Sequence, residues 1–346
     1  MKTSVLLTLF VIGLNGLFAQ DTLDQTSLYK NHLRLNSPLT YLTLPFAGDL
    51  QWRPSFTNYI LTADVAPHFF LFTESNTNFA LDIFTDIKIR ILRANSLPVR
   101  TPSFKAGATI HYKLGFVKNE NIFDYLSFTF KHHSNGQDGC PLFGYEKDAD
   151  DLCLDTGIPN PDDRIFNQAN GNFSTNFFEL GYNISTQKQD SSTKTLGWYV
   201  FRHEDSEFIG EKYHHFYIGY QYHFTGIEPE LIGRYAKNQL TFKYQRTTAA
   251  YWKNSDVRKF EADRLVLELN ANLSRMDRFG NFRFINRFSL EARYNFTVRK
   301  LASNSTSLFV MAGYKGQDDY NIYLEDSYAF IGCGISAGSI IYSLSK

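Results

Sequence analysis

Short segments in which apolar and polar residues alternate recur along most of this chain, and they limit the folds open to it. In one such segment Leu265, Leu267 and Leu269 alternate with Glu268 and Asn270. Successive side chains of a strand point to opposite faces, so the pattern predicts strands with one apolar and one polar face. No helical period competes with it, and no apolar run beyond the N-terminus is long enough for a spanning helix. Such a chain can still cross a membrane as a closed, all-β antiparallel barrel.

The N-terminus resembles an export signal. Lys2 precedes an apolar run that ends at Leu14, and Ala19 offers a small residue for cleavage. This arrangement is typical of a secretory signal peptide and is too short for a membrane helix. The predicted organisation is a signal peptide, an N-terminal periplasmic segment and a transmembrane β-barrel, over 1–19, 20–37 and 38–346 in turn.

Composition agrees with a barrel in a bacterial outer membrane. Aromatic residues make up 16% of the chain, which suits the aromatic girdles of such barrels. Lys and Arg together equal Asp and Glu, so the formal net charge is zero. Nothing therefore indicates nucleic acid or another polyanion as a partner.

Thirteen segments alternate strongly enough to be candidate strands. They lie at 38–46, 57–72, 77–92, 105–116, 121–134, 172–185, 194–203, 213–224, 238–248, 263–274, 284–297, 306–315 and 328–342. A bacterial single-chain barrel needs an even number, so we expect about 12 strands, with 14 as the alternative. The segments 263–274 and 284–297 are the suspect pair, because one of them could be a long loop hairpin.

The longest connection, 135–171, is acidic and is predicted to be an extracellular loop, because outer-membrane barrels place their long loops outside. Cys140 and Cys153 bracket part of it and could form a disulfide in an exported chain. Cys333 is expected to be a small apolar side chain within a strand.

A histidine and a serine share one face at the end of a candidate strand. From position 122 the even residues are mostly apolar towards the strand end, where they include Phe128 and Phe130, and the same set continues through His132 to Ser134. This set is the predicted lipid face, where polar groups cost free energy unless they are paired. Serine becomes a nucleophile when a histidine takes its proton, so the pair is a candidate catalytic dyad.

A third group should orient the histidine from the adjoining strand. Period-two parity over 172–185 places Asn176 on the apolar face and Glu179 on the lumen side, so it selects Asn176. The blander interpretation is an interfacial histidine, followed by a serine and an Asn135-Gly136 pair at a turn. His214, His215 and His223 lie on both faces of one strand and are interpreted as interfacial or lumenal rather than metal-binding.

The run His132-x-Ser134-Asn135-Gly136 resembles the signature of the outer-membrane phospholipase A family, in which an arginine follows. Similarity continues upstream and downstream, at 95–101, 313–321 and 331–334. The resemblance implies a twelve-stranded barrel that hydrolyses phospholipid acyl esters with calcium and is active as a homodimer. It also implies Ser134 as nucleophile, which offers its backbone N–H to the oxyanion, His132 as general base and Asn176 as its orienting group.

Calcium ligands are implied by the same resemblance. They would be Ser96 of one subunit and the region of Gln137 and Asn172 of the other, although Gln137 stands where the family has arginine. We therefore expect an outer-membrane serine hydrolase of the phospholipase A1/A2 type. The alternatives are a lipid A deacylase-like barrel, with eight strands and Glu179 as third member, and a non-enzymatic channel or adhesion barrel whose loops carry its function.

Overall fold

The computed structural model describes most of the predicted barrel. The described residues are 32–33, 35–47, 59–72, 78–92, 102–114, 122–135, 174–190, 208–225, 233, 235–252, 260–276, 283–297, 306–318, 320 and 327–337. The predicted signal peptide, Cys140 and Cys153 lie outside them. Within the described residues, no helix is both long enough and apolar enough to cross a membrane.

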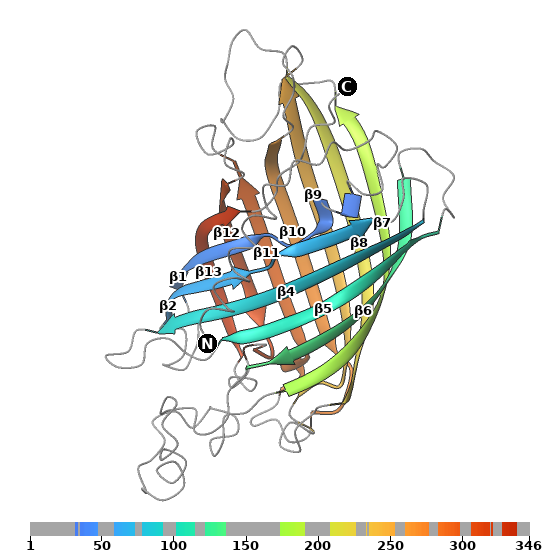
Figure 1. The fold of residues 1–346 in the computed structure, drawn as a ribbon. Coiled ribbons are helices and arrows are strands. Elements are labelled where there is room, and N and C mark those ends of the chain that lie inside the picture. The colour runs from blue at the N-terminus through green and yellow to red at the C-terminus, as the bar shows by residue number, and fades with distance from the viewer. Residues whose placement is uncertain are drawn as a thin grey trace, which may run out of the picture.

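The described strands form a single antiparallel sheet that closes on itself (Figure 1). The strands are β1 (Thr40–Ala47), β2 (Tyr59–Val65), β3 (His68–Phe72), β4 (Phe79–Leu92), β5 (Ser103–Lys113), β6 (Ile122–Ser134), β7 (Ser174–Asp190), β8 (Phe208–Thr225), β9 (Asn238–Trp252), β10 (Phe260–Asn272), β11 (Phe288–Phe296), β12 (Thr306–Lys315) and β13 (Tyr328–Ala337). Strands that are neighbours in sequence pair with each other, except β2 with β3, and β1 pairs with β13 to close the barrel. A short 3-10 helix, Phe284–Arg287, precedes β11.

Strands β2 and β3 occupy one position in the barrel. Both strands pair with β4. Strand β2 pairs with the C-terminal half of β4, and β3 pairs with its N-terminal half. They are separated by Ala66 and Pro67, and proline has no N–H to give to a sheet. Thirteen strand segments with two of them in one position make twelve barrel strands, which confirms the expected number.

The expectation that either 263–274 or 284–297 is a long loop hairpin is wrong. Strands β10 and β11 are both part of the barrel wall, and they pair without interruption from Asp263 with Phe296 to Ala271 with Phe288. The candidate segment 194–203 lies outside the described residues. The barrel is complete without it, because β7 pairs directly with β8 from Asn176 to Asp190.

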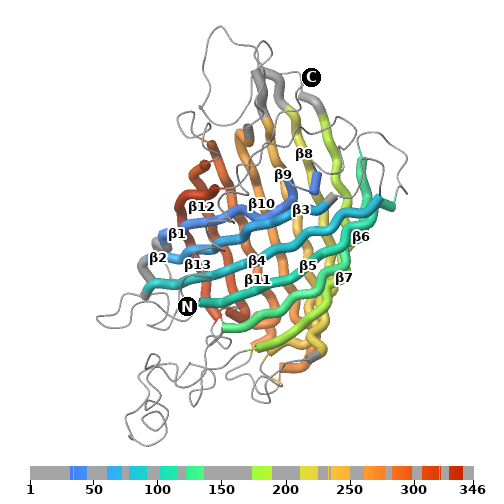
Figure 2. The backbone as a smooth tube through the Cα atoms, viewed as in Figure 1, coloured from blue at the N-terminus to red at the C-terminus, as the bar shows by residue number. Residues whose placement is uncertain are grey.

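Figure 2 traces the backbone of the barrel wall. The side chains of this wall are apolar outside and polar inside. Exposed apolar side chains cover its outer surface; examples are Leu44, Ile83, Ile110, Phe128, Leu180, Phe216, Ile218, Phe242, Leu290, Val310 and Ile335. Buried polar side chains fill its interior; examples are Asp82, Arg90, Thr109, Thr129, Asn183, His215, Gln245, Arg264 and Asn295. This distribution is the reverse of a water-soluble protein and is the one that a lipid environment requires.

Residues that precede β1 lie in the lumen. Asn36 Nδ2 lies 3.1 Å from Tyr125 Oη and 3.0 Å from Ser185 Oγ, and both of these residues are on the inner face. From the opposite wall, Gln245 donates to the Leu35 carbonyl at 2.8 Å. His32 is fully buried in the same segment, and burial lowers its pKa to about 3. The segment is therefore held by hydrogen bonds from several strands.

Candidate active site

The pairing of β6 with β7 brings two of the predicted site residues together. His132 lies directly opposite Asn176, and Ser134 lies opposite Ser174. His132 Nδ1 is 2.9 Å from Asn176 Oδ1. A histidine, an amide and a serine are thus clustered where β6 ends and β7 begins.

This hydrogen bond decides which nitrogen of His132 carries the proton. An amide oxygen can only accept, so His132 Nδ1 must donate to Asn176 Oδ1. In the neutral ring, Nε2 then has a lone pair and can accept a proton. Ser134 is the next residue on the same face, about 7 Å away along the strand. The ring is therefore held in the tautomer that a general base for Ser134 requires.

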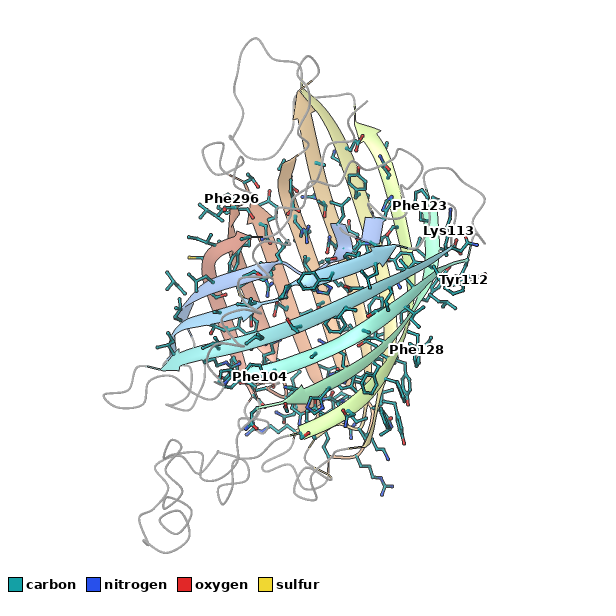
Figure 3. The ribbon with its side chains drawn as sticks, in the orientation of Figure 1. Phe104, Tyr112, Lys113, Phe123, Phe128 and Phe296 are labelled. Carbon is teal, nitrogen blue, oxygen red and sulfur yellow. The ribbon has the colours of Figure 1, made fainter. Side chains whose placement is uncertain are left out.

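His132, Ser134 and Asn176 lie on the outer surface of the barrel. Phe128 and Phe130 precede His132 on the same face of β6, and they are 46% and 41% exposed. Figure 3 shows Phe128 on the outer side of the wall. On β7 and β8, the rings of Phe178 and Phe224 stack at 4.3 Å, and Phe130 lies 5.7 Å from Phe178. The prediction that the even positions of β6 form the apolar outer face is confirmed, and this aromatic surface directly adjoins the polar cluster.

Glu179 lies on the inner face of the same strand. Its carboxylate accepts from Lys131 Nζ at 3.2 Å, and Tyr217 Oη donates to it. Tyr217 has room because Gly181 and Gly219 lie against its ring, where any side chain would collide with it. Glu179 is therefore part of an ion pair on the lumenal side of the wall, away from His132. The hydrogen-bond partner of His132 is Asn176.

The three histidines of β8 lie on both faces of that strand. His214 contacts Tyr244 Oη at 2.9 Å, whereas His215 and His223 are buried on the inner face. No group of three or more His, Cys, Asp or Glu side chains within the described ranges could hold a metal ion. Cys333, on β13, is free and half-buried.

The predicted calcium ligands, Ser96, Gln137 and Asn172, lie outside the described residues. The strand ends that flank them are described, and Ser134 at the end of β6 pairs with both Phe104 near the start of β5 and Ser174 at the start of β7. The connections that contain these ligands therefore leave the barrel at the end that carries Ser134. Hydroxyl and amide oxygens are suitable calcium ligands, so the donor types fit the ion.

Parity predicts the face on which Asn176 lies, but it does not predict an irregularity beside this residue. Asn176 pairs with Thr225 while Phe177 pairs with His223, so one extra residue, Phe224, is inserted in β8 at this point. Such a β-bulge often occurs beside an active site and redirects the neighbouring side chains. No local sequence signal marks it, because it depends on how two strands that are distant in sequence align.

The fold and the distribution of side chains define this protein as a transmembrane β-barrel of twelve strands. Neither protein-family models nor curated proteins match the chain. Similar solved structures include the outer membrane phospholipase A from Escherichia coli, with 10% identity and a TM-score of 0.48 over 91% of this chain and 99% of that one. A Salmonella typhi outer membrane phospholipase dimer with bound calcium has 11% identity and a TM-score of 0.46, over 92% of this chain and 100% of that one.

LpxR from Salmonella typhimurium is also similar, with 10% identity and a TM-score of 0.37 over 86% of this chain and 98% of that one. A likeness of this degree does not transfer an activity, because function depends on the residues of a site rather than on the fold.

Proposed function

We propose that this protein is an outer-membrane serine hydrolase that cleaves acyl esters of phospholipids. The proposal rests above all on the hydrogen bond from His132 Nδ1 to Asn176 Oδ1, which lies on the lipid-facing side of the wall with Ser134 beside it. Polar side chains at lipid depth are costly and are found where they have a function. The proposal further includes a cleaved signal peptide over 1–19 and an extracellular loop over 135–171.

The three side chains can perform acyl transfer with ordinary serine hydrolase chemistry. Ser134 Oγ attacks the ester carbonyl while His132 Nε2 takes its proton. His132 then gives that proton to the departing glycerol oxygen, and an acyl-enzyme remains on Ser134. Water attacks this ester, again with His132 as base, and releases the fatty acid. Asn176 keeps the imidazole in the required tautomer throughout and places no charge next to lipid.

The location of the site favours a lipid substrate. A membrane phospholipid beside the barrel would have its acyl chains against Phe128 and Phe130 and its ester groups nearer the strand end. Ser134 lies at that strand end, where the wall gives way to the loops. A soluble ester would gain nothing from a dyad that faces hydrocarbon, so the geometry supports phospholipid as the substrate class.

Calcium and dimerisation belong to the proposal through the family resemblance. Ser96, Gln137 and Asn172 would hold the ion, which when bound would supply positive charge near the developing oxyanion. Since Ser96 would come from a second copy, a calcium requirement and a homodimer would appear together. An exposed dyad in a membrane is hazardous to its cell, and such a requirement would limit its activity.

Hydrolysis of a micellar phospholipid by the refolded protein tests the proposal. We expect the wild type to release fatty acid with calcium and much less with a chelator. Ser134→Ala and His132→Ala should each lower the rate by at least about 10³-fold, because each removes a group that acts in bond making and breaking. No release by a folded wild type would contradict the proposal, and a channel or adhesion function would then explain the chain better.

His214→Ala provides a matched control. His214 is half-buried and hydrogen-bonded to Tyr244, but it lies on β8 away from Ser134. Its removal should leave the rate unchanged. An equal loss in His214→Ala and His132→Ala would mean that the assay reports barrel integrity rather than the dyad.

A further inference from the structure

A row of buried polar side chains lies on the inner face of the wall, directly behind the site. It comprises Ser103 on β5, His133 on β6, Thr175 on β7 and His223 on β8, and all four are at most 2% exposed. We call this set the inner row. Three of its four strands, β6 to β8, carry the site and the aromatic rings beside it on their outer surfaces.

The inner row is joined by short hydrogen bonds. Ser103 Oγ lies 2.7 Å from His133 Nε2, and Thr175 Oγ1 lies 2.8 Å from His223 Nδ1. His133 and Thr175 are opposite each other in the pairing of β6 with β7, so the two hydrogen-bonded pairs are neighbours. Gln221 Nε2 contacts the other ring nitrogen of His223 at 2.6 Å.

Each member on β6 and β7 is next in sequence to a site residue. His133 lies between His132 and Ser134, and Thr175 directly precedes Asn176. Adjacent strand residues share a peptide unit and point to opposite faces. Fixing His133 and Thr175 inside the barrel therefore fixes the backbone from which the outer side chains extend.

The bulge in β8 explains why such fixing is needed. The regular pairing of β7 with β8 is broken between Asn176 and Phe177. His223 lies at this break, opposite Phe177, and its ring packs against that of Phe177 at 4.7 Å and that of Tyr235 at 4.8 Å. The hydrogen bond from His223 to Thr175 thus ties β7 to β8 where the ladder between them is irregular.

We infer that the inner row is a positioning device for the proposed active site: Thr175 and His223, with Ser103 and His133, hold the strand backbones so that Asn176 meets the ring of His132. This inference rests on the proposed function. None of the four residues touches substrate, and each acts through the backbone of a neighbour. Catalysis is sensitive to displacements of about 1 Å, so loosening this region should slow the reaction without unfolding the barrel.

Thr175→Val tests the inference, because valine keeps the shape of threonine and removes only the hydroxyl. We expect kcat to fall roughly tenfold with KM unchanged, and Thr175→Ser to restore it. In an Asn176→Ala background, Thr175→Val should have no further effect, since the side chain that it positions is gone. An equal loss in both backgrounds would overturn the inference.

Thr129→Val is the matched control. Thr129 is also buried on the inner face of the wall and is hydrogen-bonded across to Thr109 at 2.9 Å, but it lies further from the strand end. The Thr129→Val substitution should leave kcat unchanged. A loss equal to that of Thr175→Val would identify a general packing effect and would contradict a positioning role.

A measurement without turnover separates this inference from the proposed function. Nitrogen NMR of histidine-labelled protein in micelles reports the tautomer of His132. The signal of His132 is identified by its disappearance from the spectrum of His132→Gln. We expect the protonated Nδ1 signal in the wild type, a changed signal in Thr175→Val and an unchanged one in Thr129→Val. An unchanged His132 signal in Thr175→Val would overturn the inference. If the wild type is inactive while its His132 signal responds to Thr175→Val, the positioning role stands and the proposed hydrolase does not.

Discussion

Strand β7 takes part in two histidine–asparagine hydrogen bonds, one on each side of the barrel wall. On the outer face His132 Nδ1 lies 2.9 Å from Asn176 Oδ1, and on the inner face His215 Nε2 lies 2.9 Å from Asn183 Oδ1. Residue types and distances are the same, but the surroundings differ. The inner pair adjoins other polar groups, whereas the outer pair adjoins phenylalanine rings and faces lipid.

The fold itself accounts for only one of these two pairs. In the lumen, polar groups satisfy one another, and His215 is stacked beside Tyr125, which also accepts a hydrogen bond from Asn36. An outer face needs only apolar side chains, so the outer pair adds nothing to the barrel that leucines would not supply. The inner pair is therefore structural, and the outer pair is best explained by chemistry.

The largest expected difference is between the two histidines. His132→Ala should lower phospholipid hydrolysis by at least about 10³-fold and leave the unfolding temperature nearly unchanged. His215→Ala should retain hydrolysis but unfold at a lower temperature, because Asn183 then loses a buried partner at a cost of about 1–3 kcal/mol. Initial rates and heat-dependent gel mobility would measure both quantities. Reversal of this pattern would place the chemistry inside the barrel.

The two asparagines should differ in the same sense but less strongly. Asn176→Ala keeps the dyad but frees the ring, so kcat should fall roughly ten- to hundredfold with KM unchanged. Asn183→Ala removes contacts to His215 and to Ser127 Oγ, the latter at 3.1 Å, and should lower stability alone. Steady-state kinetics beside thermal unfolding would separate the two effects. Equal kcat for both variants would remove Asn176 from the proposed site.

The smallest effect is expected at Asn36, which adjoins the inner pair through Tyr125. Asn36→Ala loses part-buried hydrogen bonds to Tyr125 and Ser185 and should cost about 0.5–1.5 kcal/mol of stability, with hydrolysis unchanged. Denaturant unfolding in micelles would measure the cost. A loss of hydrolysis instead would show that the segment preceding β1 affects the outer site, and it would contradict a purely structural role for the inner face.

The sequence predicts the features that follow from a period of two. Alternation assigns His132 and Ser134 to the outer face and Glu179 to the lumen, and the structure has the described residues in these places. A strict period leaves no freedom, since a shift by one residue would move every apolar side chain to the wrong face. The even strand number follows from the rule that a bacterial single-chain barrel begins and ends on the same side of the membrane.

Features that depend on long-range alignment could not be predicted. The bulge at Phe224 and the inner row arise from pairing between strands far apart in sequence. Leu35 and Asn36 carry no local signal for the lumen, because their contacts come from opposite walls. Local alternation alone also cannot tell which candidate segments enter the barrel wall, and it casts doubt on 263–274 and 284–297, which both contribute strands to it.

The proposed role of Ser134 is that of a nucleophile activated on the lipid-facing surface. An organophosphonate ester that reacts with activated serines, followed by peptide mass spectrometry, tests it most directly. We expect the folded barrel to be modified at Ser134, and we expect His132→Ala to abolish the modification while His215→Ala does not. A folded wild-type barrel that remains unmodified at Ser134, or one modified equally well without His132, would contradict it.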